Sequence, residues 1–567
     1  MTREELLRIL SFSDKMRSIS EKRTELSATD ARWNIISYAM RRHLEGKLLT
    51  ITSIASAADV PYGTAMRRIG ELIEQGLLLK RARTQSGKSF SLHPTRKLIV
   101  EYESYAVQLK AMVGDTFGFN TGDGELADFY FGGSYMASRI LSYPNAARSP
   151  VGYDKSIRIL APIDPTFTTL NTFRGALNEF CGTNIEVVNL PLDALHKAIA
   201  ENNAKPKSEF DLISVDLPWI GQLAEDQMIR SLDDIIRQER YNASDFHSTA
   251  WKGSAYRGQQ YGLPIQPTAE LLFCRSDLVA KAGLSTPRTT EDVLLCARTL
   301  HRSAMGLSGI VMNYGRGTPV AHTFVQTLAD FGQPVLDLAP LGDSFDVDDI
   351  SGERLRPRIA SEAGRRTAEY LKELLSYAHP DSMRCTWDRR IEIFARGEAA
   401  LSYGWSVRAA RFELDETSPA YRNVEFVPHP PSPGLTPVSP IGGFALAMPA
   451  SLSDERVRTA WKVMEYLTRP EMMKWYVQNG NLTSPRFSTS ADPEVQSMTG
   501  MIRQIDMMER RGELQIWPRP PVQEFNDLLC VLGTDIHAML QGNVTIAEAL
   551  NSAQNRVDAI MRAHGHY

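Results

Sequence analysis

The chain has 567 residues, a length at which a single hydrophobic core no longer suffices, so two or more domains are expected. Its 43% hydrophobic and 23% charged residues are typical of a folded globular protein and exclude a disordered chain. The formal net charge of -4 gives no overall signature of nucleic-acid binding, so that function would require a local basic patch.

The N-terminal segment and the cysteines indicate the cellular compartment of the chain. Residues 1–23 are interrupted by charge every few positions and lack the apolar run of a secretory signal, and no later segment holds about 18 consecutive apolar residues. The five cysteines are far apart and form no Cys-x-x-Cys pair, which is typical of buried thiols in a reducing compartment. We therefore expect a cytoplasmic protein with no membrane span, no metal and no cofactor.

A helical segment is the first informative feature after an N-terminal extension of residues 1–27. Residues 31–43 place apolar side chains at helical spacing, and a short helix and a turn follow before Pro61. The next helix keeps its apolar residues on one face and ends at Gly76. Residues 77–92 then alternate and turn in the manner of a β-hairpin, and a further helical period follows them.

This order of helix, helix, helix, hairpin and helix over residues 28–115 resembles the winged helix of MarR-type bacterial regulators. The segment GLLLKR matches the start of that family's wing, and LHPTRK matches its end. Eight Lys and Arg residues accompany only two Glu residues between positions 61 and 100. The resemblance implies an α+β winged helix-turn-helix that binds operator DNA as a homodimer. The residues expected to contact DNA are Tyr62, Thr64, Arg67, Arg68, Arg81, Arg83 and Lys88. The alternative interpretation is a protein-interaction module.

Residues 116–155 mix Gly, Pro and Asn with aromatic residues and keep no long helical period. Flexible tethers are poor in aromatic residues, so we expect a connector that is docked onto its neighbours. A surface loop whose aromatic side chains cover a neighbouring core is the alternative interpretation.

Strand-like runs and helical stretches alternate from residue 156 onward. The runs SIRILAP, IEVVNLP and FDLISVD are each followed by a helical stretch, a pattern that predicts an α/β domain with a mainly parallel sheet. In open sheets of this kind, ligands bind at the carboxyl ends of the strands. The loops that follow Leu160 and Ser214 are therefore the expected location of a binding site.

Residues 156–567 also resemble extracellular solute-binding proteins of family 1, which bind sugars. The matching stretches, in chain order, are residues 210–236, 256–300, 389–410, 440–482 and 515–560. They include the motifs YGLP, AGLSTP, GEAALSYGWS and IGGFALAMP. The resemblance implies a periplasmic-binding-protein type II fold, in which two α/β lobes hold a carbohydrate in the cleft between them. The whole chain is then multidomain, with this two-lobed fold following a winged helix-turn-helix.

A sugar requires apolar faces for its C–H surfaces and a ring of hydrogen-bond donors and acceptors for its hydroxyl groups. The candidate ligand-binding residues, at or near the positions where the resemblance locates the cleft, are Asp164, Thr166, Asp216, Trp219, Gln266, Tyr314, Trp387, Trp405, Arg408, Gly442, Gly443 and Phe444. An aromatic residue at these positions can instead belong to the core, and the two glycines can serve a tight turn. Arg408 suits an anionic ligand such as a sugar phosphate or a uronate, or else it pairs with a nearby carboxylate.

Together these features predict a cytoplasmic, ligand-responsive transcriptional regulator, in which carbohydrate binding changes the affinity of the winged helix for operator DNA. The alternative is a cytoplasmic carbohydrate-binding protein, or a solute-binding protein of an ABC transporter, without DNA regulation. An enzyme is not expected, because the chain contains no G-x-S-x-G, H-E-x-x-H or P-loop motif.

Overall fold

The computed structural model describes most of the chain. The described residues are 6–7, 9–14, 31–45, 47, 49–82, 90–117, 156–342 and 344–567. The chain divides into two units: the first comprises residues 1–133 with the short segments 340–344 and 510–512, and the second comprises the rest. The predicted extension at residues 1–27 and connector at 116–155 fall largely outside the described residues. No helix in the described ranges is long and apolar enough to cross a membrane.

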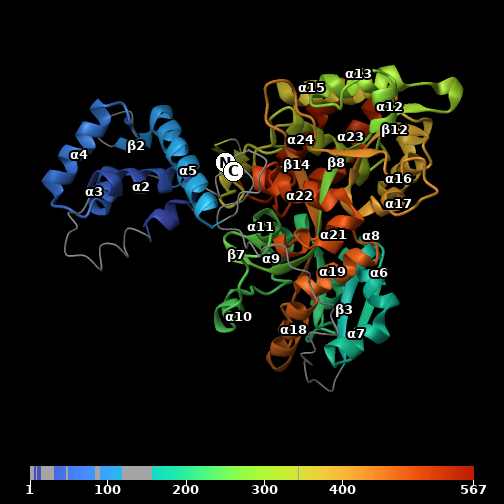
Figure 1. Cartoon of the computed structure of the whole chain (residues 1–567), viewed down its shortest axis with the longest axis horizontal. Coiled ribbons are helices and arrows are strands. Elements are labelled where there is room, and N and C mark those ends of the chain that lie inside the picture. Colours follow the sequence, from blue (N-terminus) through green and yellow to red (C-terminus); the bar gives the residue numbers. More distant parts are fainter. Residues whose placement is uncertain are drawn as a thin grey trace. The chain divides into compact units, whose positions relative to one another are not determined.

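The first unit is built from helices and one β-hairpin (Figure 1). Its elements are α2 (Ala31–Leu44), α3 (Ile51–Ala57), α4 (Tyr62–Glu74), β1 (Leu78–Ala82), β2 (Phe90–Pro94) and α5 (Arg96–Phe117). Thr50 starts α3 with a capping box, and Ala65, Ile69 and Leu72 form the buried face of α4. Gly76 has a φ of 71°, which lets the chain leave α4 and enter β1. This element order is the one that the sequence pattern predicts.

The second unit contains a nine-stranded sheet with the main path β4-β3-β5-β14-β8-β12-β9, to which β13 and β15 are added at β8 and β14. The strands are β3 (Ile157–Pro162), β4 (Ile185–Leu190), β5 (Leu212–Asp216), β8 (Gly262–Arg275), β9 (Ser308–Val311), β12 (Ala399–Trp405), β13 (Val424–Val427), β14 (Ser439–Ala447) and β15 (Leu514–Gln515). β3 is parallel to β4 and β5, whereas β14 is antiparallel to β5 and β8. The sheet is therefore mixed rather than mainly parallel, because β14 runs against the strands of the parallel half.

The long strand β8 joins two halves of this sheet. Its residues 262–269 pair with β14, and its residues 270–274 pair with β12. All 14 residues of β8 are buried. We call the part built around β3, β4 and β5 the first lobe, and the part built around β9, β12 and β13 the second lobe. In Figure 1, β8 and β14 lie in the middle of this unit, between α6 (Pro165–Thr172) and α7 (Arg174–Cys181) of the first lobe and α13 (Thr290–Leu300) and α15 (Glu362–Leu375) of the second.

Helices cover both faces of each lobe. The main helices of the first lobe are α6 (Pro165–Thr172), α7 (Arg174–Cys181), α8 (Leu192–Asn203), α9 (Ile220–Glu225), α18 (Asp454–Leu467) and α19 (Pro470–Gln478). Those of the second lobe are α13 (Thr290–Leu300), α14 (Thr318–Asp330), α15 (Glu362–Leu375), α16 (Trp387–Ala395), α23 (Phe525–Leu540) and α24 (Ile546–Ala563). The neighbouring residues Ile159 and Leu160 of β3 belong to different core clusters, one with Trp461 of α18 and one with Leu195 of α8.

The remaining elements of the second unit are short connections. The helices are α10 (Asp233–Gln238), α11 (Ser248–Gly253), α12 (Ser276–Lys281), α17 (Ala410–Glu413), α20 (Phe487–Ser490), α21 (Pro493–Met498) and the longer α22 (Gly500–Arg511). A two-stranded sheet pairs β6 (Ala255–Tyr256) with β7 (Gln259–Gln260). Residues 340–345, most of which belong to the first unit, pair β10 (Pro340–Leu341) with β11 (Ser344–Phe345).

Gly443 lies where β14 passes closest to β8. Its φ is 93°, and a Cβ atom there would be 1.9 Å from the carbonyl oxygen of Gln266. Gly443→Ala is expected to lower the free energy of unfolding of the second unit by about 3 kcal/mol or more, because the two strands must move apart. Urea denaturation followed by tryptophan fluorescence measures the loss.

Gly434→Ala is the matched control for this prediction. Gly434 has a φ of 86°, but no described atom outside its chain neighbours lies within 4 Å of the added Cβ. Only backbone strain then acts, and a loss of about 1 kcal/mol is expected. Equal losses for the two variants would contradict the close approach at Gly443 as the cause.

Candidate ligand-binding site

Polar side chains follow three strands at the junction of the two lobes. Asp164 is the N-cap of α6, directly after β3, and Asp216 is the last residue of β5. Arg408 ends the 3-10 turn Ser406–Arg408, which follows β12. The two loops that the sequence pattern indicates therefore supply two carboxylates at the carboxyl ends of neighbouring parallel strands, where α/β sheets bind ligands.

The strand register aligns further predicted residues with Asp216. Across β5, β14 and β8, Asp216 is opposite Phe444, and Phe444 is opposite Gln266. In the second lobe, Trp405 at the end of β12 is opposite Glu270 of β8. The strand β8 thus carries a polar side chain into each lobe. We call the following group the interlobe site: Asp164, Asp216, Gln266, Trp405, Arg408 and Arg519.

Asp164 connects the lobes through its two oxygens. Nε2 of Gln266 donates a hydrogen bond to Oδ1, and Nη2 of Arg408 lies 3.5 Å from Oδ2. Nε of Arg408 also donates to Oδ1 of Asp388, at 3.2 Å. Burial raises the pKa of Asp164, while Arg408 and Gln266 oppose the rise. Arg408 therefore pairs with carboxylates, which is one of the two roles that its sequence position allows.

Arg519 is a second guanidinium group at the junction. Its Nη2 lies 3.6 Å from Oδ2 of Asp216, and its Cζ lies 5.1 Å from the ring centroid of Trp405. Burial lowers the pKa of Arg519, while Asp216 and Glu270 counteract that shift. The residue lies in the irregular segment between β15 and α23. Both interlobe arginines therefore have a carboxylate from the first lobe as a neighbour.

A buried ionic cluster adjoins Trp405 in the second lobe. Nη2 of Arg390 lies 2.5 Å from Oε1 of Glu270, and both side chains are 2% exposed. His429 lies between two carboxylates: its Nε2 is 3.9 Å from Oε2 of Glu270, and its Nδ1 is 3.2 Å from Oδ1 of Asp330. Burial raises the pKa of Asp330 to about 6, although His429 opposes the shift. For His429, burial acts to lower the pKa, but Asp330 and Glu270 bring it above its usual value.

This cluster is expected to make the free energy of unfolding of the second unit fall as the pH rises. The raised pKa of Asp330 gives a contribution that is complete below about pH 3.8 and is lost as the pH rises through about 6. The raised pKa of His429 acts in the same direction, and its contribution begins to fall near pH 6.5. Urea denaturation between about pH 4 and pH 8 measures the slope. Asp330→Asn is expected to reduce the slope, because it removes the Asp330 titration and also the carboxylate that raises the pKa of His429. An unchanged slope would assign the dependence to other groups.

Several buried polar atoms at this junction have no hydrogen-bond partner among the described residues. They are Oγ1 of Thr166, Oε1 of Gln266, Nε of Arg519 and Nδ1 of His322. Burial lowers the pKa of His322 well below its usual value, with Arg519 and Arg390 adding to the shift, so the imidazole is neutral. Each unpaired buried polar atom costs about 1–3 kcal/mol. The junction therefore has hydrogen-bonding capacity that the described residues do not use.

Three more predicted residues lie beside the interlobe site. Thr166 is in the first turn of α6, two residues after Asp164, and its side chain is fully buried. The ring of Phe444 packs edge-on against Phe167, with 5.9 Å between centroids. Trp387 begins α16, and its ring lies edge-on to His322 at 5.4 Å. These residues lie close to Asp164, Gln266 and His322 at the junction of the lobes.

Two predicted residues are part of the core instead. Trp219 belongs to the cluster under α8, and its ring lies 4.8 Å from that of His196. Tyr314 is fully buried, and its hydroxyl donates to the carbonyl oxygen of Leu371 at 2.9 Å. Both positions agree with the alternative interpretation, in which the aromatic residues belong to the hydrophobic core. Local spacing does not reveal to which side of a turn a large ring is directed.

The sequence analysis did not identify four residues that the structure brings to the junction. They are Glu270, His322, Asp388 and Arg519. Glu270 had a usable signal, because a charged residue within the apolar run TAELLFC indicates a buried ion pair. For Arg519 the only sequence signal was the pair of flanking prolines, which restrict the backbone. Among the described residues, no three His, Cys, Asp or Glu side chains are grouped so that they can hold a metal ion.

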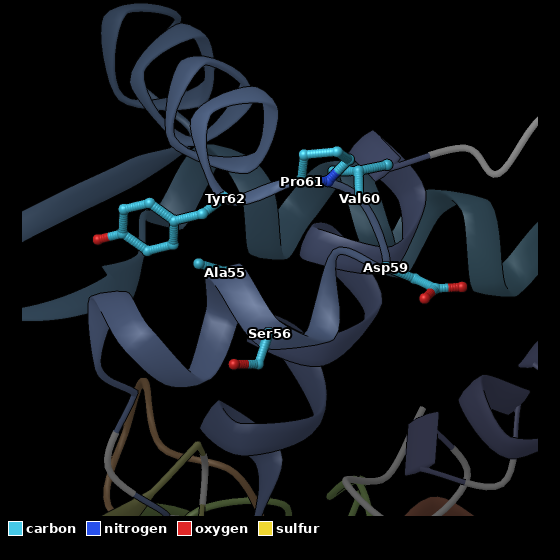
Figure 2. Close-up of a pocket in the computed structure, with 6 residues that line it drawn as sticks. All are labelled: Ala55, Ser56, Asp59, Val60, Pro61 and Tyr62. Atoms are coloured by element: carbon cyan, nitrogen blue, oxygen red, sulfur yellow. The ribbon is translucent and has the colours of Figure 1, made fainter.

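The first unit has a pocket of about 480 Å³ between α3 and α4 (Figure 2). Its lining residues are Ala55, Ser56, Asp59, Val60, Pro61 and Tyr62. In Figure 2 the carboxylate of Asp59 and the ring of Tyr62 point away from each other. The polar groups therefore do not converge on one ligand position, as they do in a specific binding site. The interlobe site is therefore a better candidate for ligand binding than the pocket between α3 and α4.

The positions predicted to contact DNA are only partly described. Arg83 and Lys88 lie outside the described residues, and only the backbone of Arg81 is described. The other predicted positions are on α4, where they are exposed or half-buried: Tyr62, Thr64, Arg67 and Arg68. The carboxylate of Glu71 lies 3.9 Å from Arg67 and 2.8 Å from Arg68, which reduces the positive charge of this face.

Residues 175–501 match the family described as bacterial extracellular solute-binding protein. The match covers more than half of the chain, so the chain belongs to this family.

Solved structures of solute-binding proteins share the fold of the second unit. An ABC transporter solute-binding protein from Agrobacterium radiobacter K84, in complex with ribitol, has a TM-score of 0.65 and 22% identity over 73% of this chain and 100% of its own. Maltose-bound MalE3 of T. maritima has a TM-score of 0.62 and 18% identity, over 71% and 99% of the two chains. A solute-binding protein from Agrobacterium vitis S4 with bound D-mannitol has a TM-score of 0.61 and 16% identity, over 72% and 99%. At these identities the likeness establishes the fold.

These matches confirm the two-lobed fold and correct the predicted function. The prediction of a ligand-responsive transcriptional regulator is wrong, because the family and the similar structures are solute-binding proteins. They give no support to operator DNA or a homodimer as partners, or to the MarR-like identification of residues 28–115. The physical reason for the error is that a basic cluster on a small helical unit does not determine what that unit binds. The alternative, a solute-binding protein without DNA regulation, agrees with the family.

Proposed function

We propose that the second unit binds a sugar or a polyol at the interlobe site, as a solute-binding protein of the kind that serves ABC transporters. The observation that carries the proposal is a group of buried polar atoms at the junction that have no hydrogen-bond partner among the described residues: Oγ1 of Thr166, Oε1 of Gln266 and Nε of Arg519. The guanidinium of Arg519 lies over the ring of Trp405. A hydroxyl group both donates and accepts hydrogen bonds, so a polyol supplies each of these atoms with a partner. The indole ring supplies an apolar face for the C–H groups.

The charged residues have complementary roles in such binding. Asp164 and Asp216 accept hydrogen bonds from ligand hydroxyls, and Arg408 and Arg519 donate to hydroxyl oxygens. The carboxylates belong to the first lobe, whereas Arg408 follows a strand of the second lobe. A ligand that pairs with both sides stabilises the arrangement in which the lobes are together. It replaces the single 3.5 Å contact between Arg408 and Asp164.

The similar structures support this class of ligand. They contain ribitol, maltose and D-mannitol, which are all polyhydroxylated and uncharged. The proposal transfers only the chemical class to this chain, because sequence identities of 16 to 22% leave the individual contacts free to differ.

A thermal unfolding experiment on the full chain tests the proposal. A ligand that binds only the folded protein, present at about 100 times its Kd, raises the free energy of unfolding by about 2.7 kcal/mol. We expect a rise in Tm with at least one compound from a panel that includes ribitol, D-mannitol and maltose. The proposal is wrong if no sugar or polyol in the panel changes the Tm.

Two variants show whether the rise comes from the interlobe site. Asp164→Asn keeps the shape of the side chain but removes its charge, and it is expected to reduce the Tm rise. Asp234→Asn is the control, because Asp234 lies on α10 with 81% of its side chain exposed. The control is expected to respond to ligand like the unmodified chain.

The cytoplasmic location stays a prediction from the sequence, and it differs from the extracellular location in the description of the family. Cys181, Cys274, Cys296 and Cys385 are buried, Cys530 is exposed, and none of the five forms a disulfide. Fractionation of cells that produce the full chain, followed by immunodetection in each fraction, tests the location.

A further inference from the structure

Arg519 is a buried cation whose hydrogen-bonding capacity is unused. Its side chain is 5% exposed, and its guanidinium group makes no hydrogen bond to any described residue. Oδ2 of Asp216 is 3.6 Å from Nη2, which is beyond hydrogen-bond distance. A guanidinium group has five N–H donors, and a buried charge without hydrogen bonds is strongly unfavourable. The surroundings of Arg519 are therefore arranged to receive a group with several acceptor oxygens.

Trp405 and Gly442 fix the guanidinium in one orientation. The group lies over the face of Trp405, with 5.1 Å from Cζ to the ring centroid. A Cβ atom at Gly442 would be 2.2 Å from Nη1 of Arg519 and 3.0 Å from the indole ring, so only glycine leaves room for the stacked pair. Pro518 and Pro520 restrict the backbone on both sides of Arg519. A donor group that is already oriented loses less entropy when it binds a ligand.

A second arginine lies near Asp164, the carboxylate that neighbours Asp216. The side chain of Arg408 is 17% exposed and reaches Asp164 with only one contact of 3.5 Å. Burial raises the pKa of Asp216, and the neighbouring Asp164 adds to the rise. A carboxyl group of this kind takes up a proton more readily and can then donate a hydrogen bond to a bound anion. The junction can therefore accommodate a negatively charged ligand group, because the arginines and a protonated carboxyl group offset repulsion from the carboxylates.

We propose that the interlobe site binds a sugar or polyol that carries one carboxylate or phosphate group, and that Arg519 binds this group. The inference rests on the proposed function and specifies its ligand class. Carboxylate and phosphate accept two parallel hydrogen bonds from one guanidinium, a geometry that a single hydroxyl does not match. The hydroxyl groups of the same ligand then pair with Asp164, Gln266 and Thr166.

Isothermal titration calorimetry of the full chain with matched ligands tests this inference. Ribitol, D-ribonate and D-ribitol 1-phosphate differ only at C1, and mannitol, mannonate and mannitol 1-phosphate form a second set. We expect one charged member to bind at least about 100-fold more tightly than its neutral counterpart. The two charged members of each set show whether the site prefers a carboxylate or a phosphate.

Three variants connect that preference to Arg519. Arg519→Gln is expected to weaken binding of the charged ligand at least about tenfold more than binding of ribitol, so that most of the preference for the charged ligand is lost. Gly442→Ala keeps the charge but displaces the guanidinium, so it is expected to weaken binding of the charged ligand as well and serves if Arg519→Gln does not fold. Arg365→Gln is the control, because it removes a half-exposed positive charge from α15 of the same lobe. It is expected to leave every affinity unchanged.

The possible results separate the inference from the proposed function. The inference is supported if the preference for the charged ligand over the neutral one is smaller in Arg519→Gln or Gly442→Ala than in the unmodified chain. Neutral members that bind as tightly as charged ones overturn it but leave the proposed function in place. A charged preference that survives both variants also overturns it, because another residue then binds the anion. If neither these sets nor any sugar or polyol of the thermal panel binds, both the inference and the proposed function are wrong.

Discussion

Glu270→Ala is expected to lower the free energy of unfolding of the second unit by about 3–5 kcal/mol. Glu270 and Arg390 form an ion pair of 2.5 Å in which both side chains are 2% exposed. Removal of the carboxylate leaves the Arg390 guanidinium buried without its partner, and Nε of Arg390 already has no hydrogen-bond partner among the described residues. His429 loses one of its two neighbouring carboxylates as well. Urea denaturation followed by tryptophan fluorescence reports mainly on the second unit, since Trp33 is the one tryptophan outside it.

Two further variants distinguish loss of the ion pair from loss of packing volume. The double variant Glu270→Leu and Arg390→Met replaces both charges with apolar groups, and it is expected to recover most of the lost stability. Glu362→Ala breaks the exposed pair with Arg365 on α15, and because solvent screens this pair its loss of stability is expected to be much smaller than that of Glu270→Ala. A Glu270→Ala loss as small as that of Glu362→Ala would show that solvent reaches Arg390.

Much of the second unit was predictable because strand and helix patterns are local. The runs SIRILAP and FDLISVD correspond to β3 and β5, and Asp164 and Asp216 lie at the carboxyl ends of these strands. The direction of the crossing strands was not predictable from the same patterns. β14 is antiparallel to β5, and this pairing depends on contacts between segments more than 200 residues apart.

The side chains of the site were harder to predict than its strands. Trp219 has the chemistry of a sugar platform, but the 3-10 turn Leu217–Trp219 directs it into the core under α8. Arg519 lies in a segment without periodicity, and its role depends on Trp405 and Gly442, which are distant in the sequence. Residue type and spacing identify where a strand ends, whereas the direction of a side chain depends on packing from elsewhere in the chain.

In the first unit, local sequence patterns predict the secondary structure but not the binding partner. Its helices and hairpin are predictable from apolar periodicity and from Gly76. The partner that this unit binds is not predictable in the same way. The net charge of a helix face depends on nearby acidic side chains as well as on the number of basic residues in the sequence. Arg67 and Arg68 contributed to the predicted basic face, yet both lie close to the carboxylate of Glu71.

Trp405→Ala is expected to reduce the affinity of the chain for its best ligand from the matched sets by at least about 100-fold. The indole ring is at the end of β12, it carries the guanidinium of Arg519, and it presents an apolar face at the interlobe site. Truncation removes the ring contact and also releases Arg519 from its fixed orientation. Trp405→Phe keeps a smaller aromatic face, so a loss of about tenfold is expected. Calorimetric titration of each variant measures the change in Kd.

Loss of a large buried ring also destabilises a protein, so the affinity change needs a control of equal size. Trp475 of α19 is as well buried as Trp405, and it packs against Phe173 and Phe180 in the core of the first lobe. Trp475→Ala is expected to lower stability by about 3–5 kcal/mol, as Trp405→Ala does, without a change in Kd for the folded protein. If both variants lose affinity together, the effect of Trp405 is general loosening of the fold. If only Trp405→Ala does, the ring is part of the binding surface.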